Sequence, residues 1–132
     1  MVFVKSLMAA YQKVDLELRA YLKPHGITIQ QYNVLKILKG AHKPLSTSVI
    51  RERMLEPMAD SSRLVERLCS KGWVERNACS GDRRLVDVTI SSAGLSFLER
   101  IPNMDEVLNK LFLKITDKEA ATLNKLLNKI RK

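Results

Sequence analysis

The sequence contains few of the residues that mark several large protein classes. Two cysteines and two histidines among 132 residues are too few for a disulfide framework, and they lack the spacing of a zinc site. No apolar run approaches the roughly 18 residues of a transmembrane helix, and the apolar start ends at Lys5, too early for a signal peptide. Five glycines and four prolines disfavour glycine-rich phosphate loops and turn-rich all-β folds. We therefore expect one cytoplasmic domain without metal, cofactor or membrane segment.

Negative charge is also scarce. Lys and Arg number 23 and Asp and Glu 14, so the formal net charge is +9. This surplus favours a polyanionic partner, with nucleic acid ahead of an anionic membrane. The basic residues are spread along the chain, so folding must bring a binding face together. No nucleophile–base set or paired-carboxylate motif is present, and we expect no enzymatic activity.

Apolar residues at helical spacing open and close the chain. One stripe predicts an amphipathic helix over residues 4–22, and its members are Leu7, Tyr11, Val14, Leu18 and Tyr21. Beyond Pro102, which must kink or break a helix, Thr116-x-x-Glu119 is a capping box that starts a last helix. That helix is expected to turn four residues inward: Leu123, Leu126, Leu127 and Ile130. Core packing would explain the first stripe, but a seam between two chains explains it better.

Two further helices are predicted in the first half of the chain. Thr28-x-x-Gln31 is a capping box, which starts a helix that should end at Gly40. Ser46 can cap a short third helix whose inner face includes Met54.

A fourth helix is predicted from Pro57, which fits a first helical position, to Lys71, with Gly72 ending it. A helical wheel gives it an inward face of Ser61, Leu64, Val65 and Leu68. The outward face consists of Ala59, Ser62, Arg63, Glu66 and Ser70, with Arg67 on its flank. Such a face can reach base edges and phosphates, although a solvated charged face would look similar.

After Gly72 the apolar period changes to two, which predicts a β-hairpin over residues 74–90 with a long polar tip. Asp82, Arg83 and Arg84 lie on the descending side of that tip. Two adjacent arginines repel each other unless negative groups meet them. Asp82 could offset one arginine, and a phosphate backbone could meet the other.

This order of elements is typical of a winged helix-turn-helix, and residues 27–99 resemble the MarR/SlyA family of bacterial transcriptional regulators. The matching motifs include Ile27-Thr28-x-x-Gln31-Tyr32, Ser62-Arg63-Leu64-Val65-x-Arg67-Leu68, Lys71-Gly72-Trp73-Val74-Glu75-Arg76 and Asp82-Arg83-Arg84. The resemblance implies a mainly α fold with a small β-hairpin wing in a single domain, residues 1–132. Dimerisation helices at 1–23 and 101–132 would flank a winged helix-turn-helix core at 27–100.

The resemblance also implies a function. A homodimer would bind a pseudo-palindromic operator in double-stranded DNA, as a repressor released by a small aromatic or phenolic ligand. Arg63 would read a base edge, and the other implied DNA-binding residues are Ser46, Ser62, Arg67, Asp82, Arg83 and Arg84. Plausible ligand-binding residues are Met8, Tyr11, Tyr32 and Met54. The alternative is a winged-helix protein-interaction module without DNA binding, whose recognition face would be apolar.

The sequence departs from the family's pattern at the start of the recognition helix. Asp60 and Ser61 replace a common Thr-Val pair, so a negative charge would lie near DNA. Asp60 could act only as a helix cap, or it could change the preferred base sequence. Cys69 and Cys79 leave oxidant sensing open as a minor alternative, although relatives that sense oxidants use a cysteine on the first helix, where this chain has none.

Overall fold

The computed structural model describes residues 1–55, 60–79 and 82–131, and for residues 78, 79 and 82–85 it describes the backbone alone. The chain divides into two compact units. We call Leu18–Pro102 the core unit, and Met1–Glu17 together with Asn103–Lys132 the terminal unit. Helix α1 (Val2–Leu22) contributes to both units.

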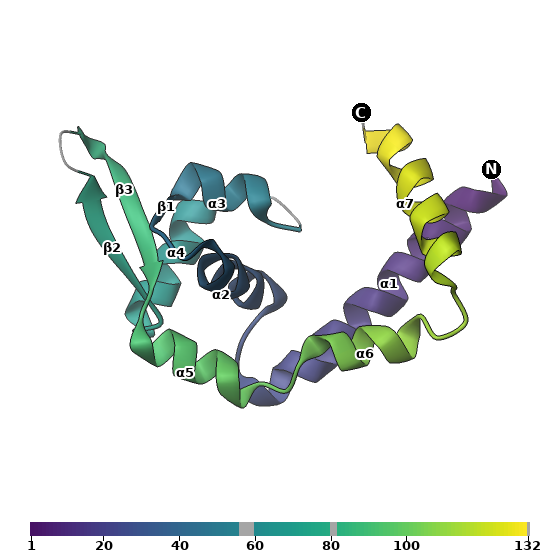
Figure 1. Ribbon diagram of the computed structural model, residues 1–132, viewed down its shortest axis with the longest axis horizontal. Helices are drawn as coiled ribbons and strands as arrows, with labels where there is room; N and C mark the ends of the chain where they lie inside the picture. Colours follow the sequence, from purple (N-terminus) through teal and green to yellow (C-terminus); the bar gives the residue numbers. More distant parts are fainter. Residues whose placement is uncertain (56–59, 80–81, 132) are drawn as a thin grey trace. The chain divides into compact units, whose positions relative to one another are not determined.

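The core unit contains the helices and strands expected of a winged helix-turn-helix (Figure 1). After the end of α1 and a short 3-10 helix η1 (Lys23–His25), the helices are α2 (Ile29–Ala41), α3 (Thr47–Arg53), α4 (Ser61–Ser70) and α5 (Ser92–Arg100). The strands are β1 (Leu45–Ser46), β2 (Val74–Cys79) and β3 (Asp82–Ile90). The hydroxyl of Tyr21 donates a hydrogen bond to the carbonyl oxygen of Pro102, which links the end of α1 to the chain after α5.

The sheet has three antiparallel strands in the order β1-β3-β2. The hairpin was predicted, and Val74 pairs with Ile90 at its base. The sequence analysis missed β1, a strand of two residues in which Leu45 pairs with Val88. So short a strand has no periodicity of its own, and its partner lies 43 residues further along the chain.

Apolar residues from the α-helices and strands of the core unit meet in one core. The residues with the least exposed surface are Leu22, Val34, Leu35, Ile50, Val65, Leu68 and Val88. Their spacing on α2 and α4 follows the helical periodicity seen in the sequence. The core therefore fixes one face of each helix and leaves the opposite face for other contacts.

Local capping signals set most of the helix starts. Thr28 and Gln31 form the predicted capping box at α2, and the hydroxyls of Ser46 and Ser91 accept from backbone N–H groups at α3 and α5. The predicted end of α2 at Gly40 is wrong. The helix continues through Ala41, and His42 ends it in the left-handed conformation with φ 55°.

The terminal unit contains the first part of α1 with α6 (Met104–Leu111) and α7 (Asp117–Arg131). The predicted break at Pro102 and the Thr116–Glu119 capping box are both present. The expected inward burial of the α7 stripe is wrong for a single chain. The exposed fractions of Leu123, Leu126 and Ile130 are 47%, 51% and 62%, because no described part of the unit covers them, and only Leu127 of the four is half-buried.

Candidate nucleic-acid interface

The candidate interface is built on α3, the turn after it and α4. Ser46 is the N-cap of α3, and its hydroxyl accepts from the Val49 N–H at 3.2 Å. Ile50 and Met54 are buried behind α3, as predicted. The proposed helix start at Pro57 and the outward Ala59 lie outside the described residues. Among the described residues, α4 begins after Asp60, whose carboxylate caps the helix.

Helix α4 has the two faces that the helical wheel predicted. Ser61, Leu64, Val65 and Leu68 are buried, and the exposed residues are Ser62, Arg63, Glu66, Arg67 and Ser70. Because the apolar face holds the helix against the core, the Ser/Arg face must point away from it. The helix therefore presents polar and cationic donors on a rigid support.

A hollow of about 240 Å³ opens between the start of α3, helix α4 and the sheet. It brings together two of the predicted site residues, Ser46 and Ser62. It also contains Arg76 of β2, which the sequence analysis did not count as a site residue. Strand periodicity could have found Arg76, because it lies on the same face of β2 as the buried Val74. These hydroxyl and guanidinium donors can together hold an anionic oxygen.

The wing is formed by β2 and β3, which extend as a hairpin beside α4 (Figure 1). Strand β3 begins at Asp82, which pairs with Cys79, and the register shifts between Ala78 and Cys79. Ser80 and Gly81 lie outside the described residues. The side chains of Asp82, Arg83 and Arg84 also lie outside the description, so their predicted ion pair and contacts stay predictions.

The end of α4 is joined tightly to the base of the wing. Gly72 adopts φ 77°, and its N–H and that of Trp73 donate to the carbonyl oxygens of Cys69 and Leu68, which is a Schellman motif. The Ser91 hydroxyl donates to the Gly72 carbonyl oxygen at 2.6 Å. The Ser91 N–H donates to the Trp73 carbonyl oxygen at 3.0 Å. These hydrogen bonds fix the position of the wing relative to helix α4.

Aromatic packing reinforces this junction. The rings of Trp73 and Phe97 stack with centroids 4.0 Å apart, and the Lys71 ammonium lies 4.6 Å from the centre of the Trp73 ring. The same ammonium donates to the Gly26 carbonyl oxygen, which ties the end of α4 to the start of α2. Lys71 therefore has a structural role in the core unit.

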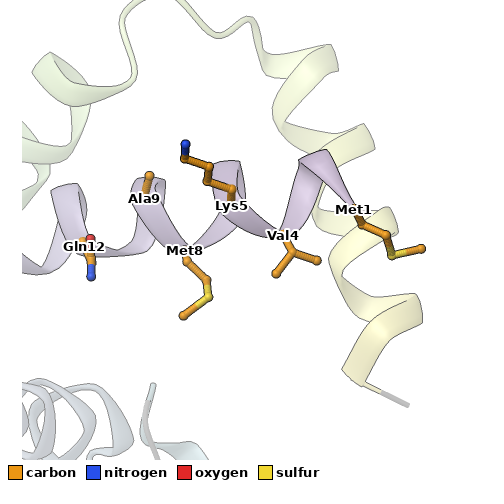
Figure 2. Close-up of a pocket in the computed structure, with 6 residues that line it drawn as sticks. All are labelled: Met1, Val4, Lys5, Met8, Ala9 and Gln12. Atoms are coloured by element: carbon orange, nitrogen blue, oxygen red, sulfur yellow. The ribbon is translucent and has the colours of Figure 1, made fainter.

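The four residues suggested for ligand binding fall into two groups. Tyr32 and Met54 are buried in the core unit, with exposed fractions of 9% and 5%. Met8 and Tyr11 lie on the part of α1 that belongs to the terminal unit, and both are exposed. Met8 lines an open hollow along α1, and Figure 2 shows its side chain on the same side of the helix as Val4.

Other kinds of site have little support in the described part of the chain. There, no three His, Cys, Asp or Glu residues are grouped so that they could hold a metal ion. Cys69 is a half-buried free thiol. Over the same residues, no helix is both long and apolar enough to cross a membrane.

Comparison with known proteins gives a consistent family. The sequence model of the MarR family matches residues 25–85, from η1 through α4 into the wing. The multiple antibiotic resistance protein MarR of Escherichia coli K12 is 33% identical over 122 residues, which cover 90% of this chain and 83% of that protein. The HTH-type transcriptional repressor MdtR of Bacillus subtilis is 29% identical, over 86% of this chain and 74% of the repressor.

The solved structures agree with the sequence comparisons. A cysteine-to-serine mutant of E. coli MarR, crystallised in complex with operator DNA, matches with a TM-score of 0.82 and 29% identity. The match covers 98% of this chain and 94% of that one. AbsC, a MarR family transcriptional regulator from Streptomyces coelicolor, shares the fold with a TM-score of 0.86 at 20% identity. By its sequence and its fold, the chain belongs to the MarR family.

Proposed function

We propose that this protein is a transcriptional regulator that binds operator DNA as a homodimer and represses transcription until a small aromatic or phenolic ligand releases it. The observation that carries the proposal is the exposed Ser62, Arg63 and Arg67 face of α4, on a helix whose opposite face is buried. The likeness of the whole chain to a MarR structure in complex with operator DNA supports it. The exposed face of α4 is polar and charged, whereas the recognition face of a protein-interaction module would be apolar.

In this proposal α4 enters the major groove, and Arg63 donates two hydrogen bonds to O6 and N7 of a guanine. Ser62 and Arg67 contact a neighbouring base or phosphate. A second phosphate lies at the hollow near the start of α3, where Ser46 and Arg76 supply donors.

The wing would contact the flanking minor groove. Arg84, with Arg83, would enter it where narrow A·T-rich DNA concentrates negative potential. Asp82 would hold the wing arginine by an ion pair. These contacts depend on groove shape and phosphate charge, so they would contribute affinity to many sequences.

A second copy of the chain would cover the exposed apolar residues of the terminal unit. Two copies of α4 would then reach successive major grooves, about 10 bp apart. This spacing makes the preferred operator a pseudo-palindrome. We further propose that the protein acts by binding and not by catalysis, because its relative MdtR is named a transcriptional repressor. Access to operator DNA requires a cytoplasmic location.

The release of DNA by a ligand is proposed to involve Met8, Tyr11, Tyr32 and Met54, whose thioethers and phenol rings suit an aromatic ligand. Benzoate and salicylate are suitable probes. Each should raise the melting temperature and lower the affinity for DNA if it binds the native protein. The absence of both effects at millimolar concentration would contradict this part of the proposal.

The proposal is tested by selecting duplexes from a random DNA library and measuring their affinity over a salt series. Arg63→Ala should weaken binding to the selected duplex by about 1–3 kcal/mol and relax discrimination at one base pair per half-site. Arg84→Ala should instead weaken binding to many sequences and lower the salt slope by about one. Affinities within about twofold of wild type for both variants would contradict DNA binding through this helix and this wing.

A further inference from the structure

Asp60 contacts Arg63 in two ways at the start of α4. Its Oδ1 accepts a hydrogen bond from the Arg63 backbone N–H at 3.2 Å. Its Oδ2 lies 3.2 Å from Nε of the same arginine. One carboxylate therefore holds both the backbone and the side chain of the residue that we expect to read a base.

We propose that Asp60 is a positioning residue that sets the specificity of Arg63 for guanine. This inference rests on the proposed function and deepens it. A guanidinium carries five N–H donors, and the contact with Asp60 engages the one on Nε. The four donors on the two terminal nitrogens stay available for O6 and N7 of guanine. The ion pair thus restricts Arg63 to an end-on approach and reduces the number of conformations that it must lose on binding.

The charge of Asp60 contributes a second, opposite effect. Its side chain is 54% exposed at the start of the helix that faces DNA. A carboxylate there repels the phosphates of every duplex, whatever its sequence. Specificity is the difference between correct and incorrect binding, so the uniform repulsion lowers affinity without changing that difference, and the favoured geometry of Arg63 raises it.

A capping role alone does not require a carboxylate. Helices α2, α3, α5 and α6 begin with the neutral caps Thr28, Ser46, Ser91 and Asn103. Asparagine caps a helix about as well as aspartate. An exposed ion pair also adds little to the stability of a free protein. The carboxylate therefore has its main consequence when Arg63 meets DNA.

The test separates the cap from the ion pair. Asp60→Asn keeps a capping oxygen and removes the charge. Glu99→Gln is the matched control, because Glu99 is an exposed carboxylate on α5, outside the DNA-reading face of α4, and its loss changes the net charge equally. Wild type and Arg63→Ala are first compared on single-base variants of the selected duplex, which identifies the base pair that Arg63 reads. Affinities for those variants and for calf-thymus DNA are then measured for all four proteins and for the Asp60→Asn/Arg63→Ala double variant.

We expect Asp60→Asn to lower discrimination at that base pair by about threefold to tenfold, which is part of what a bidentate arginine contact supplies. Its affinity for calf-thymus DNA should rise at low salt. Glu99→Gln should leave discrimination within about twofold of wild type, and Asp60→Asn should not change it in the Arg63→Ala background. In the free protein, NMR should show slower hydrogen exchange of the Arg63 Nε–H in wild type than in Asp60→Asn.

Three results would overturn the inference. Unchanged discrimination in Asp60→Asn would mean that Asp60 only caps the helix and does not position Arg63. The proposed function would stay intact. A loss of discrimination that persists without Arg63 would mean that Asp60 reads a base itself. Equal binding of wild type to every duplex in the library would overturn the proposed function together with this inference.

Discussion

The core unit and the terminal unit differ in how far their apolar residues are exposed. Every apolar residue found buried lies between Leu22 and Ile101, within the core unit. Among the residues whose side chains the structure describes, the exposed large apolar ones lie in the terminal unit, with the exceptions of Leu55 and Leu95. A single copy of the chain therefore completes the core of the core unit, whereas the terminal unit leaves its apolar residues uncovered. We therefore propose that the core unit recognises DNA and that the terminal unit forms the dimer.

The largest effect should come from placing a charge in the terminal unit. Leu126→Asp would bury an unpaired carboxylate in each half of the proposed dimer, and association should weaken by at least about 100-fold. Light scattering should then give the 15.0 kDa of one chain in place of twice that mass. Leu55→Asp is the control, since Leu55 is 78% exposed in the core unit and should leave the mass unchanged. A monomeric wild type at micromolar concentration would contradict the assignment of assembly to this unit.

The core unit should respond strongly to a methyl group at Gly94. A Cβ there would lie 2.2 Å from the Trp73 carbonyl oxygen, and that oxygen is fixed because it accepts from the Ser91 N–H. We expect Gly94→Ala to lower the free energy of unfolding by about 2–3 kcal/mol. Urea unfolding followed by the fluorescence of Trp73, the single tryptophan, measures it. Wild-type stability in this variant would show that the junction of α4 and the wing is loose.

A smaller effect of opposite sign is expected at Gly40. This residue is exposed in the last turn of α2, and a Cβ there would meet nothing within 4 Å. Gly40→Ala should therefore raise the free energy of unfolding by about 0.5–1 kcal/mol. The same urea titration measures it. A decrease would mean that the backbone at Gly40 is not helical in solution.

The smallest effect should be a pH dependence at α7. Hydrogen bonds from the Thr116 backbone N–H and then from its hydroxyl hold the pKa of Glu119 below its ordinary value. A carboxylate with a lowered pKa stabilises the fold above the unfolded-state pKa, and this contribution is lost as the pH falls through the folded-state pKa. The NMR shift of the Thr116 N–H should follow that titration in wild type and should lose it in Glu119→Gln. A midpoint at or above the ordinary pKa of glutamate would contradict the capping geometry.

The sequence predicted those features that depend on residues close together in the chain. The caps at Thr28, Ser46 and Thr116 were predicted because each cap bonds a backbone group within three residues. The two faces of α4 were predicted because the helical spacing of its apolar residues indicates which side packs against the core.

The features that the sequence did not predict depend on distant partners. Strand β1 exists because Leu45 pairs with Val88. The end of α2 is set where the chain must turn toward that strand, so His42 adopts the left-handed conformation although Gly40 is the better local signal. The α7 stripe was predicted correctly as apolar, but most of it is exposed in a single chain, and in our proposal a second chain buries it. Arg76 joins the candidate interface because folding brings β2 beside α3 and α4.

The most direct test of this division of roles compares a full palindromic operator with a duplex that contains one half-site. Wild type and Leu126→Asp are titrated with both duplexes by fluorescence anisotropy at one salt concentration. The account predicts that wild type prefers the full operator by about 100-fold or more, because two linked α4 helices bind together. Leu126→Asp should bind both duplexes with the same weak affinity. Adding Arg63→Ala to Leu126→Asp should still remove discrimination between base pairs. A Leu126→Asp protein that binds the full operator as tightly as wild type would contradict the account.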